Sequence, residues 1–388
     1  MWITVLTLAL ANALPAMTVA TLGIVLPEVR GALGLSEVQG GALFSVLFVA
    51  ASLSSLLGGR LADRAGRFVV LVTGMTLLSS TALLALADGY AAALVLLAVA
   101  GVGYGLSTVA LYALLSDLLP TRRGLGTGLL SVTYGTGALV GPLLAGAATA
   151  VSGWRAAFLA LGALGLAMIA LPLAVRRRTS PGPGGNRHPA APASSARRLD
   201  RDVALVTAAA FFGGVLFWAT SSWAPTVLRV DKALTLGQAA LAMAAWGAMP
   251  MVGSVLVGML SDRLGRRLVM LSIALPGALA VVGIYTLLHS APALAAGFAL
   301  LGLIRSPIPS QVVALGQDSA RSHATAAASG LVMSAYYAAA VVAPLVTGAV
   351  IAALRSGVHA MVIVVPVGLL AYGALIAAVR ERRDVLRS

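Results

Sequence analysis

The sequence predicts an all-α, polytopic membrane protein whose twelve transmembrane helices form two pseudo-symmetric six-helix bundles. The first observation behind this prediction is composition. Hydrophobic residues make up 60% of the 388 residues and charged residues only 10%, against about 25% charged residues in soluble domains. The second observation is a series of apolar stretches of spanning length, and the third is an internal repeat. A chain this apolar offers little polar surface to water, so the bilayer is its natural surroundings.

Twelve apolar segments fit helices that cross the membrane. A spanning helix needs about 20 apolar residues, and lipid offers the backbone no hydrogen-bond partners, so each segment is expected to be helical. The first segment follows no basic stretch and is too long for the core of a signal peptide, so it is expected to remain as a span. The predicted spans cover residues 2–27, 38–58, 68–87, 90–116, 124–150, 154–175, 203–226, 237–258, 268–288, 292–316, 324–353 and 358–379.

A connector rich in Pro, Gly, Ser and Arg interrupts this series at residues 176–202. Such a composition is typical of a flexible linker. It divides the chain into an N-terminal six-helix bundle, residues 1–175, and a C-terminal six-helix bundle with a short tail, residues 203–388.

The basic residues indicate the orientation of the chain. Placing both termini in the cytoplasm puts 20 of the 26 Lys and Arg residues in inner loops, connector and tail, and five outside. Positive residues prefer the cytoplasmic side, so we expect a multi-pass protein of the bacterial inner membrane with both termini inside. The net charge of +14 then serves to orient the chain in the membrane, and its basic residues also contact anionic lipid headgroups. Nucleic-acid binding is not expected.

The two halves repeat one another. The segment GRLADRAGRFVV (59–70) aligns with GMLSDRLGRRLV (258–269), and each follows the second span of its half. Asp117 and Asp318 each close a fourth span, and Gly141-Pro142 corresponds to Ala343-Pro344 in the fifth. A repeat of this kind is typical of secondary transporters, whose binding site lies between the halves near the bilayer midplane.

These motifs resemble those of the major facilitator superfamily, and the resemblance covers the whole chain. The segment GALVGPLLAG (137–146) is similar to the family's glycine-proline motif, and GWR (153–155) stands where the family often has it. The resemblance implies alternating access by a protein that works as a monomer. The doubled loop motif consists of Gly59, Leu61, Asp63, Arg64, Gly66 and Arg67, and of Gly258, Leu260, Asp262, Arg263, Gly265 and Arg266.

The resemblance assigns a gating role to the loop motif. Its charged residues would latch the halves in one state, although a solvated positive-inside loop would use the same residues; they are Asp63, Arg64, Arg67, Asp262, Arg263 and Arg266. Glycines in the motif permit a tight turn. Gly141 and Pro142 are candidates for gating too, but close packing and a kink explain them better. Many proton-coupled drug antiporters of the family carry an Arg where this chain has Leu97, which argues against standard proton-driven drug efflux.

Arg305 is the exceptional charge of the sequence, because it lies near the centre of the tenth span. None of the twelve acidic residues falls near a midplane, so an Arg there is expected to face the central cavity. Pro307 and Pro309 should loosen the helix and free carbonyls to line that cavity. An unpaired guanidinium binds carboxylate or phosphate through paired N–H donors. The alternative is a structural Arg paired with helix carbonyls.

Other polar or aromatic residues at midplane depth complete the candidate site, and each alone could be ordinary packing. The repeat places Tyr104 opposite Arg305; the others are Asn12, Tyr134, Trp218, Trp246, Tyr336 and Tyr337. We therefore expect secondary active transport of a small organic anion, with efflux of apolar drugs or metabolites as the alternative. No nucleophile–base set is visible, cysteine is absent, and the four His residues lack metal-ligand spacing. No enzymatic activity, cofactor or metal is expected.

Overall fold

The structure, a computed structural model, describes residues 2–119, 123–179, 200–306, 308–320 and 325–380. In these ranges the chain is helical with no strand, which confirms the all-α prediction. Eleven stretches of the described residues are long and apolar enough to cross a membrane. The long helix α10, Leu236–Leu264, lies on the remaining predicted span, so the twelve-span pattern holds.

Each predicted span coincides with one long helix or with two consecutive shorter ones. The first half contains α1 (Trp2–Leu10), α2 (Ala13–Leu33), α3 (Glu37–Ala65), α4 (Arg67–Ser79), η1 (Ser80–Leu86), α5 (Tyr90–Leu118), α6 (Arg123–Ser152), α7 (Trp154–Met168) and α8 (Ala170–Thr179). The second half contains α9 (Arg201–Val230), α10, α11 (Arg266–Leu287), α12 (Ala291–Arg305), α13 (Ile308–Ser319), α14 (Thr325–Leu354) and α15 (Gly357–Ala378).

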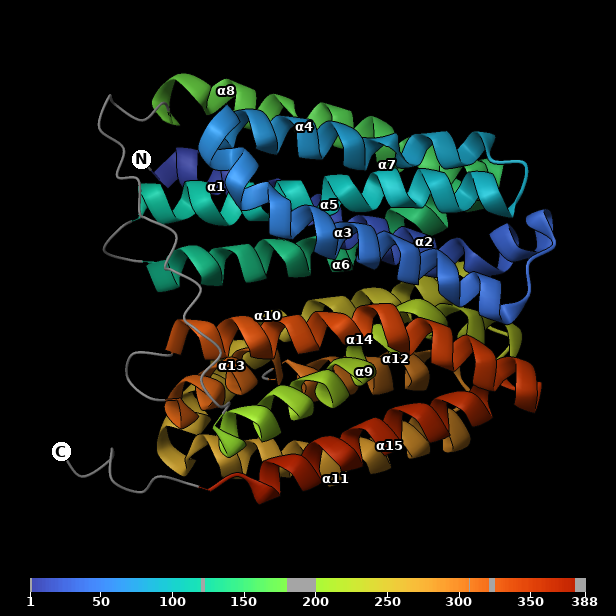
Figure 1. The fold of residues 1–388 in the computed structure, drawn as a ribbon. Helices are drawn as coiled ribbons and strands as arrows, with labels where there is room; N and C mark the ends of the chain where they lie inside the picture. Colours follow the sequence, from blue (N-terminus) through green and yellow to red (C-terminus); the bar gives the residue numbers. More distant parts are fainter. Residues whose placement is uncertain (1, 120–122, 180–199, 307, 321–324, 381–388) are drawn as a thin grey trace.

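The helices run roughly parallel to one axis, with the first half lying above the second in Figure 1. The start of α1, the end of α8, the start of α9 and the end of α15 lie at the same end of the molecule, on the left of Figure 1. We call this the terminal end and the opposite one the distal end. Residues 180–199 of the predicted connector lie outside the described residues, and the bundle boundaries at 175 and 203 stay predictions.

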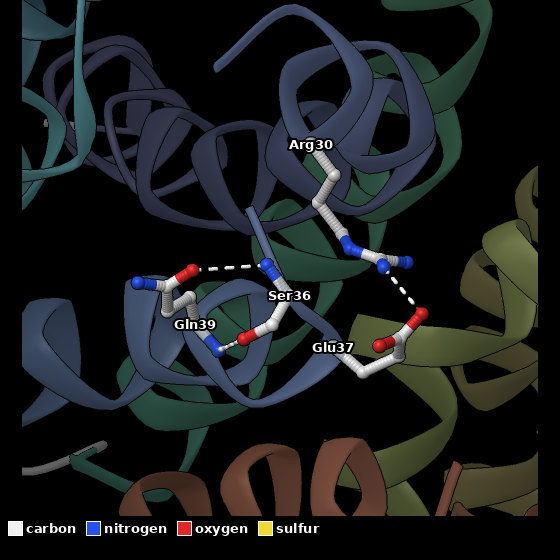
Figure 2. Close-up of polar contacts among 4 residues, drawn as sticks. All are labelled: Arg30, Ser36, Glu37 and Gln39. Atoms are coloured by element: carbon white, nitrogen blue, oxygen red, sulfur yellow. Dashed lines mark hydrogen bonds and ion pairs between the residues drawn. The ribbon is translucent and has the colours of Figure 1, made fainter. Parts of the chain in front are cut away.

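Equivalent capping and turn residues begin and end helices in both halves. Ser36 and Gln39 form a capping box (Figure 2). The backbone N–H of Gln39 donates to Ser36 Oγ over 3.2 Å, and the backbone N–H of Ser36 donates to Gln39 Oε1 over 2.9 Å. Thr235 and Gln238 form the same box at α10, and each box satisfies otherwise free helix N–H groups. Gly66 and its counterpart Gly265 turn the chain with φ of 90° and 87°, a conformation that side chains disfavour.

The two halves meet through reciprocal helix pairs, α3 with α14 and α10 with α6. A Cβ on Gly41 would lie 2.4 Å from the carbonyl oxygen of Pro344, and one on Gly247 would lie 2.4 Å from that of Ala138. These backbones touch because glycine has no side chain. Ser45 Oγ also donates to the Val341 carbonyl over 2.5 Å. These contacts, with α2 against α9, form what we call the distal seam.

An ion pair crosses the distal seam. Arg229 of α9 lies 2.5 Å from Glu28 of α2, and their side chains are only 20% and 25% exposed. The same guanidinium donates to the Ile24 carbonyl over 3.4 Å. Because one partner belongs to each half, separation of the halves at this end must break the pair.

We expect Arg229→Ala to raise the population in which the distal end is open about fivefold, because the lost pair is worth about 1 kcal/mol. The chain has no cysteine, so Ser221→Cys, beside the cavity between the halves, can report opening through its rate of labelling by a membrane-impermeant maleimide.

The matched control for this prediction is Arg155→Ala, since Arg155 bonds the Ala85 carbonyl within one half over 2.9 Å. Glu28→Gln should match Arg229→Ala, and the double variant should add little to either change. Unchanged labelling in Arg229→Ala would mean that the pair does not hold this end closed.

Candidate functional site

Arg305 lies at a break in the tenth span, as the two prolines predict. The helix α12 ends at Arg305 and α13 begins at Ile308, while Pro307 lies outside the described residues. Pro309 has no N–H to donate to the Arg305 carbonyl four residues earlier. Ser306 partly compensates the break, since its N–H and its hydroxyl reach the Leu303 carbonyl at 3.3 and 2.8 Å. Because of this break, Arg305 is the last residue of α12.

The Arg305 side chain is buried against aromatic rings. The residue is 9% exposed, and its guanidinium carbon lies 4.4 Å from the centroid of Phe217 and 4.5 Å from that of Trp246. Among the described residues no Asp or Glu forms an ion pair with it, and its Nε has no hydrogen-bond partner. Cation–π contacts are worth about 0.5–2 kcal/mol each, so the rings hold the guanidinium without neutralising its charge.

Further aromatic residues extend this group across both halves. Trp218 of α9 lies 4.4 Å from Phe48 of α3 and 6.3 Å from each of Tyr336 and Tyr337, measured between ring centroids. The Trp218 indole N–H donates to the Tyr336 carbonyl over 3.2 Å. The aromatic cluster that we name here comprises Phe48, Tyr104, Tyr134, Phe217, Trp218, Trp246, Tyr336 and Tyr337.

Two tyrosines of the first half complete the cluster. The hydroxyl of Tyr104 on α5 lies 3.4 Å from that of Tyr134 on α6, and the Tyr104 ring lies 5.8 Å from Phe48. Tyr104 is the donor in this contact, which leaves the Tyr134 O–H to donate to a ligand. The sequence does not single out Phe48 and Phe217, because an apolar ring in a spanning helix looks the same in sequence whether it faces lipid or the protein interior.

A small cavity of about 30 Å³ lies beside the cluster, between the halves. Its walls come from α2 and α6 in the first half and from α9 and α10 in the second, and they include Tyr134, Pro142, Phe217, Ser221 and Trp246. The volume is about that of one water molecule in the liquid. The site must therefore widen to admit an organic molecule.

Asn12, which the sequence predicts for the site, makes its described side-chain contact within the first half. It lies at the break between α1 and α2, is buried, and its Nδ2 donates to the Leu130 carbonyl of α6 over 2.8 Å. None of its described contacts is with Arg305 or the aromatic cluster. The amide ties the broken first span to α6 within one half, and a role for Asn12 in binding stays a prediction.

The loop motif forms equivalent ion pairs in the two halves, but with partners that the sequence analysis did not pair. Arg67 pairs with Asp117 at the end of α5 and donates to the Ala113 carbonyl over 3.1 Å. Arg266 pairs with Asp318 at the end of α13 over 2.6 Å. Asp63 lies in the last turn of α3. The side chains of Asp63, Arg64 and Arg263 are exposed, and that of Asp262 lies outside the described residues.

The glycine-proline motif packs α6 against α2 within the first half. A Cβ on Gly141 would lie 2.9 Å from the Met17 Cα, and Pro142 stands inside α6 and lines the cavity. These positions agree with the packing interpretation. Leu97, at the position where drug antiporters carry an Arg, is buried on α5.

Known proteins resemble the chain in sequence. The model of the Major Facilitator Superfamily matches residues 8–344 and, in a second match, residues 228–385. A probable sulfoacetate transporter of Cupriavidus necator is 30% identical over 276 residues, which cover 66% of this chain and 64% of that protein. The chain thus spans just under two thirds of that relative. A gallate transporter of Pseudomonas putida is 28% identical over 326 residues, 74% of this chain and 72% of that protein.

A multidrug resistance protein of Escherichia coli is also similar, with 28% identity over 193 residues, 47% of this chain and 45% of that protein. Among solved structures, a D-xylose-proton symporter superposes with a TM-score of 0.77 at 15% identity, covering 98% of both chains. An inward-facing bacterial homolog of the lysosomal transporter Spinster superposes with a TM-score of 0.75 at 16% identity, covering 96% of this chain and 94% of that one. The family match, the fold and the repeated loop motif agree, and the chain belongs to the Major Facilitator Superfamily.

Proposed function

We propose that the protein is a secondary active transporter that carries a small organic anion, with a carboxylate or sulfonate head, across the bacterial inner membrane by alternating access. The observation that carries this proposal is Arg305. Its buried guanidinium lies over Phe217 and Trp246, which line the cavity between the halves, and it has a free Nε and no acidic partner among the described residues. We infer that the Arg305 guanidinium serves to bind a transported ligand and does not catalyse a reaction.

The charge of Arg305 explains why the ligand is an anion. A buried unpaired charge is costly, and a bound carboxylate or sulfonate would remove that cost through paired N–H donors. Phe217 and Trp246 offer apolar surface to the body of the ligand, and the hydroxyls of Tyr104 and Tyr134 offer polar contacts. The names of the two relatives support this class, since sulfoacetate and gallate are both organic anions.

Access to the site is proposed to alternate between the two ends. We propose that the distal seam closes one end. At the other end, the ion pairs of Arg67 and Arg266 would hold the loop motifs in a latched arrangement. The excess of Lys and Arg in the loops at the terminal end supports a cytoplasmic location of that end and of both termini. The protein would act as a monomer surrounded by lipid.

Efflux of apolar drugs or metabolites is the second candidate. It is favoured by the similarity to the multidrug resistance protein and by the apolar walls of the cavity. In that case the aromatic cluster would bind the ligand, and Arg305 would serve only to hold the rings.

A thermal-shift screen of the purified protein separates the two candidates. A ligand that binds only the folded state raises the melting temperature as its concentration rises. Under the proposal, sulfoacetate or gallate stabilises the protein and lipophilic cations such as tetraphenylphosphonium do not. Stabilisation by the cations alone would overturn anion transport in favour of efflux.

A further inference from the structure

A second, larger cavity opens at the distal end, away from the aromatic cluster. Its volume is about 370 Å³, within the range of small-molecule sites. Both halves line it: Arg30 and Glu37 come from the first, and Thr226, Asp231 and Arg355 belong to the second. We call it the distal vestibule.

The acidic groups of the vestibule are already engaged. Glu37 Oε1 accepts from the Arg30 guanidinium over 2.5 Å (Figure 2). Asp231 Oδ1 accepts from the backbone N–H groups of Gly357 and Val358 at 2.9 and 3.3 Å, so it caps the start of α15. Each carboxylate thus has a local partner that reduces its demand for a cation.

Several donors of the vestibule remain free. Arg355, in the turn between α14 and α15, forms no ion pair with the described residues. Arg30 Nε is buried without a hydrogen-bond partner, although its guanidinium pairs with Glu37 and lies 5.7 Å from the Trp223 ring. Thr226 is 6% exposed, and its Oγ1 also lacks a partner. A cavity with engaged acids and free cationic and hydroxyl donors suits an anion.

We propose that the distal vestibule is a second anion site, where a small carboxylate or sulfonate binds between Arg355 and Arg30 on its way to or from Arg305. This inference rests on the proposed transport of an organic anion. An anion on Arg30 competes with Glu37, the first residue of α3, and α3 forms part of the distal seam. An anion bound in the vestibule would thereby weaken the Arg30–Glu37 ion pair and the hold of α3 in the distal seam.

The test uses protection of a single introduced cysteine, because the chain has none of its own. Ala352 lines the vestibule and is exposed, so Ala352→Cys should react with a membrane-impermeant maleimide added outside reconstituted vesicles. Sulfoacetate is the probe, since it does not react with thiols. At a concentration ten times its dissociation constant, sulfoacetate should slow labelling about tenfold, because the fraction of protein with an empty vestibule falls by that factor.

Variants separate the vestibule from the central site. Arg355→Ala should abolish the protection of Ala352→Cys, and Arg305→Ala should leave it intact. Asp88→Cys, in the exposed loop before α5 and outside the vestibule lining, should label at the same rate with and without sulfoacetate.

Two outcomes would overturn the proposal while transport stands. In one, sulfoacetate stabilises the folded protein through Arg305 but does not protect Ala352→Cys. In the other, protection survives Arg355→Ala and is lost in Arg305→Ala, which would mean that the central site closes the vestibule indirectly. Absence of both protection and thermal stabilisation, with lipophilic cations stabilising instead, would overturn the proposed anion transport as well and favour efflux.

Discussion

Replacing Arg305 by Ala is expected to weaken binding of sulfoacetate or gallate at the central site by about 10- to 100-fold and to abolish transport in proteoliposomes. Hydrogen bonds to charged groups are worth about 1.5–3 kcal/mol, and each 1.4 kcal/mol changes affinity tenfold. Arg305→Lys should recover only part of the affinity, because an ammonium keeps the charge and loses the planar fork. Calorimetric titration of the purified variants measures both effects.

The matched control is Arg155→Ala. Arg155 lies over the Trp154 ring with its guanidinium carbon 4.5 Å from the centroid, so its loss removes an arginine–aromatic contact like that of Arg305 but far from the aromatic cluster. We expect this variant to bind the anion as the unchanged protein does. Equal affinities for Arg305→Ala, Arg155→Ala and the unchanged protein would contradict an anion site at Arg305.

The burial of Arg305 could be predicted from the sequence without knowledge of tertiary contacts. A charge at the centre of an apolar span is costly wherever it faces lipid, so burial followed from its position alone, and the break at Pro309 followed from the missing N–H. The spans could also be predicted without tertiary contacts, because the length of an apolar stretch alone indicates a membrane-crossing helix. Their ends were less accurate: α3 runs to Ala65 although its apolar stretch stops near Gly58, since hydrogen bonding continues beyond the lipid-facing part.

The contacts that the sequence could not predict are those between distant residues. Arg67 has Asp63 nearby in the motif but pairs with Asp117. The reason is that the end of α3, the start of α4 and the end of α5 lie together at the terminal end. Phe48 of α3 joins the aromatic cluster through ring contacts with Trp218 of α9 and Tyr104 of α5. Asn12, chosen for its polarity at midplane depth, bonds the Leu130 carbonyl. In each case the choice of partner depends on helix packing, which hydropathy and motifs do not encode.

A single methyl group in the distal seam is expected to shift the balance between the two access states. Gly41→Ala places a Cβ 2.4 Å from the Pro344 carbonyl oxygen, and Gly247→Ala places one 2.4 Å from that of Ala138. Neither oxygen can move without its helix, so the halves must separate. Overpacking costs about 1–3 kcal/mol, which corresponds to a 5- to 150-fold rise in the distal-open population.

Gly237 provides the matched control for these substitutions, since a Cβ there meets nothing within 4 Å, although Gly237 also lies near the distal end, in the first turn of α10. Labelling of Ser221→Cys by a membrane-impermeant maleimide from outside should accelerate in Gly41→Ala and Gly247→Ala but not in Gly237→Ala. Both seam variants should retain the thermal response to the anion, because neither touches Arg305. If labelling stays slow in both while Arg229→Ala accelerates it, the distal end is closed by the ion pair, and backbone contact contributes little to the barrier. If all three leave it slow, the seam is not the barrier, and access to the site from this end is controlled elsewhere.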